Sequence, residues 1–114
     1  MVKRVVSFGE KYGRPPATDG LVLVDVRLNL RQNPWYVPSL RGLTGLDIRV
    51  GQWLNADGRM PSVVDSYVRM AQKLSDDHEL WFYCTGGHHR SVYVAERVAQ
   101  ALGLEAAHRD IYMN

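Results

Sequence analysis

Residues 79–91 read ELWFYCTGGHHRS, and this stretch decides the expected fold. The apolar and aromatic residues 79–83 predict a buried strand. Residues 84–90 form a glycine-containing loop, and residues 91–102 carry apolar side chains at helical spacing. A strand, a glycine loop and a helix in this order present backbone N–H groups and a helix N-terminus to an anion.

The rest of the chain predicts strands that alternate with helices. Residues 2–6 and 21–26 are β-branched or apolar runs of strand length, and residues 104–109 suit a last strand. The run 21–26 shows no polar alternation, which is typical of a parallel strand covered on both faces. The alternation as a whole predicts an α/β fold with a mainly parallel sheet flanked by helices.

Two further helices and one long connection lie between the predicted strands. Residues 48–54 suit a short helix, and a longer helix is expected to open at Ser62 as its N-cap, with Asp65 completing a capping box. Gly103 stands where the C′ glycine of the last helix belongs. Residues 29–47 are rich in proline and glycine and predict an irregular connection, which in compact domains is typical of a functional segment.

Length and composition restrict the class of protein. The 114 residues predict one domain over residues 1–114. Hydrophobic residues make up 46% and charged residues 23%, which argues against a disordered chain. No stretch approaches the roughly 20 apolar residues of a membrane span. The single cysteine excludes an internal disulfide and fits a reducing compartment, so we expect a cytoplasmic protein without a membrane partner.

The net charge of +2 is small, but it is unevenly spread along the chain. Residues 1–59 hold nine Lys and Arg against five Asp and Glu, whereas residues 60–114 hold five against seven. An arginine-rich half suits phosphate-bearing partners, because the guanidinium fork matches phosphate geometry. The alternative is an ordinary solvated surface.

The loop itself carries the pattern Cys84-x5-Arg90-Ser91, which resembles the loop of cysteine-dependent phosphatases. Glycines let such a loop curl its amides around a phosphate, and Arg90 can grip two phosphate oxygens. Two readings remain open: a site that only binds an anion, and a phosphatase in which Cys84 is the nucleophile. The phosphatase also needs a general acid, for which Asp47 and Asp57 are the candidates. The histidines match no usual metal pattern, so neither a metal nor another cofactor is expected.

A longer resemblance emerges from the loop and its flanks. Residues 84–96, CTGGHHRSVYVAE, are similar to the motif of the RapZ C-terminal domain family, the C-terminal domain of a bacterial RNase adapter. Further blocks agree in order along residues 5–109. They are SFG with KYG at 7–13, DVR at 25–27, NP at 33–34, LR at 40–41, TGLD at 44–47 and HR at 108–109.

This resemblance implies a fold like a phosphofructokinase subdomain and a regulatory pocket for glucosamine-6-phosphate. It also implies RNA binding and a homo-oligomeric, tetrameric adapter. The resemblance and the loop pattern together give the expected ligand site as Lys11, Cys84, Thr85, Gly86, Gly87, His88, His89, Arg90 and Ser91. Candidate RNA or ligand contacts outside it are Arg27, Arg41, His108 and Arg109.

The chain also departs from the family pattern. The kinase-like N-terminal domain and its G-x-x-x-x-G-K-[ST] loop have no counterpart in this sequence, so we expect a free-standing relative without nucleotide binding by that route. Trp35 follows Asn33-Pro34 where the family commonly has histidine, which bears on sugar specificity. His88 replaces a frequent lysine, and the chain ends without the family's basic tail. Fewer basic residues predict weaker RNA binding.

Overall fold

A four-stranded parallel sheet forms the centre of the computed structural model, which describes residues 1–113. The strands lie in the order β2–β3–β1–β4, and every neighbouring pair is parallel. The α/β fold with a parallel sheet that the sequence predicts is therefore confirmed. The strands are β1 (Arg4–Gly9), β2 (Leu21–Asp25), β3 (Glu79–Cys84) and β4 (Ala106–His108).

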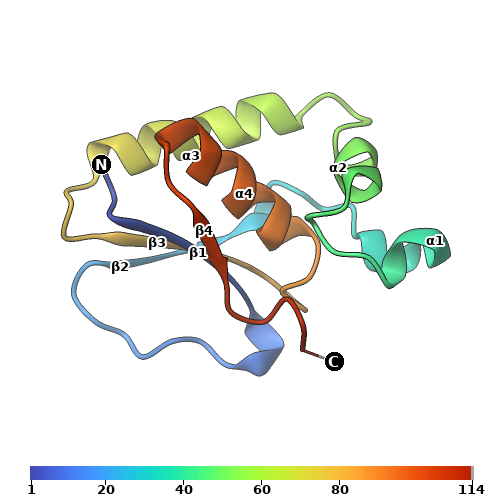
Figure 1. Cartoon of the computed structure of the whole chain (residues 1–114), viewed down its shortest axis with the longest axis horizontal. Helices are drawn as coiled ribbons and strands as arrows, with labels where there is room; N and C mark the ends of the chain where they lie inside the picture. The colour runs from blue at the N-terminus through green and yellow to red at the C-terminus, as the bar shows by residue number, and fades with distance from the viewer. Residues whose placement is uncertain (114) are drawn as a thin grey trace.

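The two long helices lie on the same face of this sheet (Figure 1). In the part of the chain that the structure describes, no helix is both long and apolar enough to span a bilayer. The α-helices are α1 (Pro38–Arg41), α2 (Ile48–Leu54), α3 (Met60–Lys73) and α4 (Arg90–Leu102). Short 3-10 helices are η1 (Glu10–Tyr12), η2 (Val26–Leu28) and η3 (Pro34–Tyr36).

The two faces of the sheet are packed differently. On the helical face, Leu80 and Phe82 are fully buried, and the ring of Tyr67 from α3 lies 5.1 Å from that of Phe82 between centroids. On the opposite face, Phe8 stacks on Tyr83 at 5.1 Å between ring centroids. The Arg14 guanidinium lies over the Tyr83 ring, so cations as well as apolar groups cover this face.

Three local expectations differ from the structure. The strand β2 is half-buried along its length because it is an edge strand, not a strand enclosed on both faces. Helix α3 begins at Met60, so Ser62 is not its N-cap; the Ser62 hydroxyl donates to the Arg59 carbonyl within the first turn instead. The connection 29–47 contains η3 and α1, where prolines at the first helical positions begin short helices.

The C-terminal end of the last helix forms as the sequence predicts. Gly103 has a φ of 73° and its N–H donates to Gln100, while the N–H of Leu104 donates to Ala99. This is a Schellman ending, in which glycine takes the left-handed conformation that reverses the chain. It returns the chain from α4 to β4 at the far edge of the sheet.

The carboxyl ends of β1 and β3 meet at one edge, with Gly9 directly beside Cys84. The chain leaves β1 toward β2, beyond β3, and leaves β3 toward β4, beyond β1. Ligands of open α/β sheets bind where connections leave neighbouring strands in opposite directions. The loop that carries the sequence motif lies at this place.

Close backbone contact fixes the course of that loop. A Cβ on Gly9 would lie 2.5 Å from the carbonyl carbon of Gly86, and one on Gly87 would lie 2.5 Å from the amide nitrogen of Gly9. Gly87 also has a φ of 71°, a backbone conformation that residues other than glycine adopt only at a cost in free energy. On the other side of the loop, the Gly45 N–H donates to the His88 carbonyl at 2.7 Å.

The segment that precedes α2 is tied to the start of α4 by two buried side chains. His89 donates from Nε2 to the Leu40 carbonyl at 3.1 Å, and Arg90 donates to the Leu30 carbonyl at 2.8 Å. Burial lowers the pKa of His89 from its ordinary value of 6.5, so the ring is neutral near pH 7. The neutral ring thereby holds α1 over the loop.

We expect Gly9→Ala to destabilise the domain by about 1–3 kcal/mol, since the added methyl group overlaps a backbone that cannot move aside easily. Gly42→Ala is the matched control, because nothing lies within 4 Å of its added Cβ, and a change within about 0.5 kcal/mol is expected. Urea unfolding followed by circular dichroism measures both. Equal stability of the two variants would contradict the packing described above.

We also expect stability to fall as the pH drops below about 6.5, because the unfolded chain takes up a proton on His89 before the folded chain does. Urea unfolding at about pH 7.5 and about pH 5.5 measures the loss. His89→Gln retains an N–H for the Leu40 carbonyl and should lose less stability over this range. His78→Gln, at a half-buried position directly before β3, should behave as the wild type. A full loss in His89→Gln would rule out His89 as the cause.

Candidate functional site

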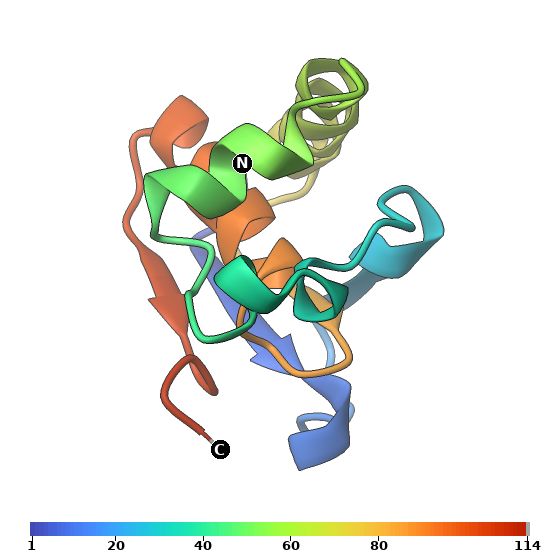
Figure 2. The same cartoon turned by 90° about the vertical axis from the view of Figure 1, so that its right-hand side faces the viewer.

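A cavity of about 280 Å³ opens where β3 ends and α4 begins. Figure 2 views this end of the molecule, with η3 and α1 crossing beside the loop that leads into α4. The cavity brings together seven of the nine residues that the sequence predicts for the ligand site, and residues from the connection 29–47 form its other wall. Its lining consists of Lys11, Asn33, Trp35, Tyr36, Cys84, Thr85, Gly86, His88, His89 and Arg90.

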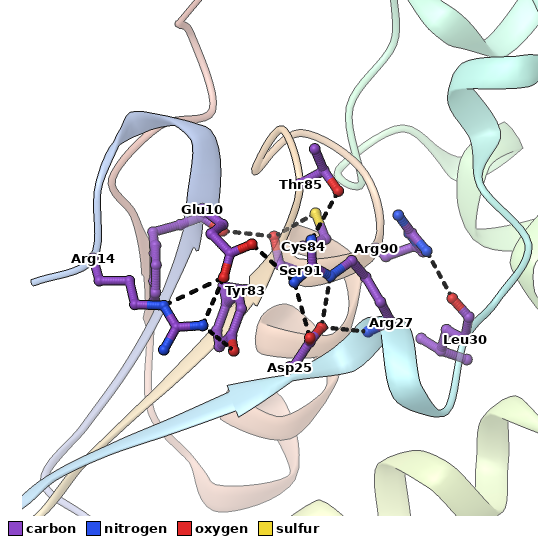
Figure 3. A network of polar contacts seen from close by, with 11 residues as sticks. Glu10, Arg14, Asp25, Arg27, Leu30, Tyr83, Cys84, Thr85, Arg90 and Ser91 are labelled. Carbon is purple, nitrogen blue, oxygen red and sulfur yellow. Dashed lines mark hydrogen bonds and ion pairs between the residues drawn. The ribbon is translucent and has the colours of Figure 1, made fainter.

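Arg90 is the most unusual group in this cavity. The residue is only 5% exposed, yet it pairs with no carboxylate among the described residues, and its Nε has no hydrogen-bond partner there. Among the described residues, its side chain donates one hydrogen bond, to the Leu30 carbonyl (Figure 3). Burial is the largest influence on this group and lowers its pKa, while the charges of Cys84 and Asp25 act in the opposite direction. A buried cation without an anion is costly, so this guanidinium can accept an anionic ligand.

The backbone of the loop offers further donors. None of the amides of residues 85–89 donates to an acceptor in the described part of the chain. The first turn of α4 follows immediately and leaves its own amides unbonded, as every helix does. Unbonded amides beside a helix N-terminus and a buried guanidinium form a positively polarised site for an oxyanion.

Cys84 lies at the base of the cavity and is 3% exposed. Its Sγ lies 3.2 Å from the Ser91 hydroxyl, which itself lies 3.4 Å from the Phe8 carbonyl oxygen. When the Ser91 hydroxyl donates to that carbonyl, its oxygen can accept from the Cys84 thiol. Ser91 is completely buried, so it supports the cysteine from beneath and does not reach the cavity.

No carboxylate lines the cavity among the residues that the structure describes. Asp47 caps α2 and pairs with Arg49, and Asp57 pairs with Arg59. The Arg49 side chain is the main reason that the pKa of Asp47 falls to about 2. Asp47 and Asp57, the two candidates for a general acid, therefore lie outside the cavity. The lowered pKa of Asp47 also keeps its carboxyl group ionised near pH 7.

A charged network lies beside the loop (Figure 3). Arg27 donates to Asp25 at 2.8 Å and to Glu10 at 3.1 Å, and its other terminal nitrogen reaches the Thr85 hydroxyl at 3.0 Å. The Arg27 guanidinium lowers the pKa of Asp25, and Arg14 followed by Arg27 lowers that of Glu10. Arg27 is thus neutralised by two carboxylates, and it positions Thr85 without lining the cavity.

The other candidate contacts lie in different places. His108 donates from Nε2 to Glu96 at 2.6 Å and accepts from the Ser7 hydroxyl at 2.6 Å, away from the cavity. Arg109 pairs with Asp110, whose carboxylate accepts the Gly9 amide. The structure brings neither His108 nor Arg109 into the cavity, and both serve the packing around β1 and β4.

Three wall residues were not in the ligand set that the sequence predicts. Asn33, Trp35 and Tyr36 line the cavity from η3. The Asn33 side chain accepts the Trp35 amide and so caps η3. Two features of the sequence indicate that the connection 29–47 is functional, namely its length and the Asn33-Pro34 pair. Neither feature indicates which of its side chains face the cavity.

Two other hollows lie on the surface. One, of about 790 Å³, adjoins the cavity and shares Lys11, Trp35 and His88 with it. The other, of about 470 Å³, is an open groove between α2 and α4 that the loop does not line. The described residues include no group of His, Cys, Asp or Glu that could hold a metal.

Comparison with known proteins places this architecture in a family. A family model described as the RapZ C-terminal domain matches residues 1–112. A nucleotide-binding protein of Petrotoga mobilis is 38% identical over 119 residues, covering 93% of this chain and 40% of that protein.

Two more relatives bear the same name. Those of Corynebacterium diphtheriae and Thermus thermophilus are each 38% identical, covering 96% and 95% of this chain and 40% and 42% of their own lengths. The chain thus spans about two fifths of the length of these relatives. The match over nearly the whole chain confirms the resemblance seen in residues 84–96, and the chain belongs to the RapZ C-terminal domain family.

Proposed function

We propose that this domain is a regulatory module that binds a phosphate-bearing small molecule in the cavity at the start of α4. The observation that carries the proposal is Arg90, a buried guanidinium without a carboxylate partner among the described residues. The phosphate group would lie against the unbonded amides of residues 85–89 and the Arg90 guanidinium. The name of the relatives, nucleotide-binding protein, agrees with a phosphate-bearing ligand.

The distribution of charge supports a small anion more strongly than an extended polyanion. Five of the nine basic residues in the first half, including Arg14 and Arg27, pair with nearby carboxylates. Pairing leaves less basic surface for the many phosphates of a nucleic acid. RNA binding, which the family resemblance implies, is therefore the second candidate.

Catalysis by Cys84 is the alternative within the same cavity. A phosphomonoesterase must protonate the leaving oxygen, and the described lining holds no carboxylate to do so. We therefore assign Cys84 to the wall of a binding site.

We expect Arg90→Met to weaken phosphate and glucosamine-6-phosphate binding by at least about ten-fold, since a charge-assisted hydrogen bond contributes about 1.5–3 kcal/mol. Isothermal titration calorimetry measures this, with Arg97→Met as a control on the exposed face of α4. Circular dichroism establishes that both variants fold. Unchanged affinity in folded Arg90→Met would overturn the assignment.

We expect Cys84→Ser to retain most of the affinity for glucosamine-6-phosphate, because the amides and Arg90 supply the anion contacts. Phosphorus NMR of the mixture followed over hours should show a shifted ester signal without growth of free phosphate, in wild type and variant alike. Release of phosphate by the wild type that Cys84→Ser abolishes would establish the phosphatase instead.

A further inference from the structure

The anion cavity continues into a much larger space. The adjoining hollow of about 790 Å³ shares Lys11, Trp35 and His88 with the cavity of about 280 Å³. About 10–15 Å³ of cavity space holds one water molecule, so either hollow has room for more than a phosphate group. A ligand that fills this site carries a substantial second group beyond its phosphate.

Trp35 stands at the junction of the two spaces and is held in place from both ends. Its amide donates to the Asn33 side chain at 3.1 Å, and its carbonyl accepts from Arg41 Nε at 2.7 Å. The Arg41 guanidinium lies 5.2 Å from the centroid of the indole ring. Trp35 is nevertheless 49% exposed as a residue. A large aromatic ring that is fixed yet half-exposed is suited to stack on a flat partner.

Neighbouring aromatic and charged groups extend this platform. Tyr36 is 78% exposed on the anion cavity, and Tyr112 is 85% exposed on the adjoining hollow. Lys11 and Arg41 line the hollow, and no carboxylate lines either space among the described residues. Aromatic faces interspersed with cations suit a group that has a π-face and is attached to phosphate.

We propose that the ligand is a nucleoside phosphate, with its phosphate at Arg90 and the loop 85–89 and its base stacked on Trp35. The inference rests on the proposed anion site and adds the class of ligand. A hexose phosphate has no planar π-face, so it would use only part of this platform. Because every base offers a π-face, both purine and pyrimidine nucleotides should gain from stacking.

The test compares ligands that share a phosphate and differ in the base. Calorimetry measures the affinity of adenosine 5′-monophosphate, cytidine 5′-monophosphate, ribose 5-phosphate and glucosamine-6-phosphate. We expect both nucleotides to bind about ten-fold or more tightly than ribose 5-phosphate, in keeping with the contribution of one stacked base. Trp35→Ala should weaken the binding of both nucleotides about ten-fold more than it weakens the binding of ribose 5-phosphate, and so remove this difference. Trp35→Phe should retain most of the difference.

The remaining outcomes distinguish failure of the stacked base from failure of the anion site. Equal affinity of the wild type for nucleotides and ribose 5-phosphate overturns the stacked base and leaves the anion site intact. No binding of any of the four esters overturns the anion site and the stacked base together. A short oligoribonucleotide could also bind far more tightly than either nucleotide and lose the same affinity in Trp35→Ala. That result would show that the aromatic platform binds RNA, and it would overturn the proposal that the ligand is a free nucleotide.

Discussion

The backbone of Gly9 lies directly against the backbone of Gly86 and Gly87, and the geometry of the site depends on this contact. It brings the end of β1 and the loop after β3 closer together than any side chain would allow. The loop then turns back into α4 with its amides unbonded among the described residues. The ends of β1 and β3 can therefore lie side by side next to the cavity, because glycines without side chains stand where the two backbones meet.

The electrostatics of the site follow from how the surrounding arginines are paired. Arg27 forms ion pairs with Asp25 and Glu10, and it contacts the loop through a hydrogen bond to the Thr85 hydroxyl. Arg90 is more deeply buried and has a single carbonyl partner, that of Leu30. Arg90 thus places a buried positive charge without a carboxylate partner, among the described residues, at the start of α4. The neutral His89 ring beside it anchors α1 without adding a second fixed charge.

The sequence predicted much of this arrangement because its strongest signals are local. The apolar strand, the glycine loop and the amphipathic helix around residues 79–102 are recognisable without reference to the rest of the chain. Two contacts join residues that are far apart in the sequence, so no local pattern reveals them. They are the backbone contact between Gly9 and Gly87 and the hydrogen bond from His89 to α1. The capping signal at Ser62 misleads for a different, local reason, because α3 begins two residues earlier, at Met60.

NMR of the backbone amides and arginine side chains shows whether inorganic phosphate binds at the loop and at Arg90. Uniformly ¹⁵N-labelled protein is titrated with phosphate at constant ionic strength, and shifts are followed for backbone amides and for arginine Nε–H groups. We expect saturable shifts at the amides of residues 85–90 and at Arg90 Nε, the buried donor that lacks a partner among the described residues. Saturable shifts confined to another surface, or none at any concentration, would contradict this expectation.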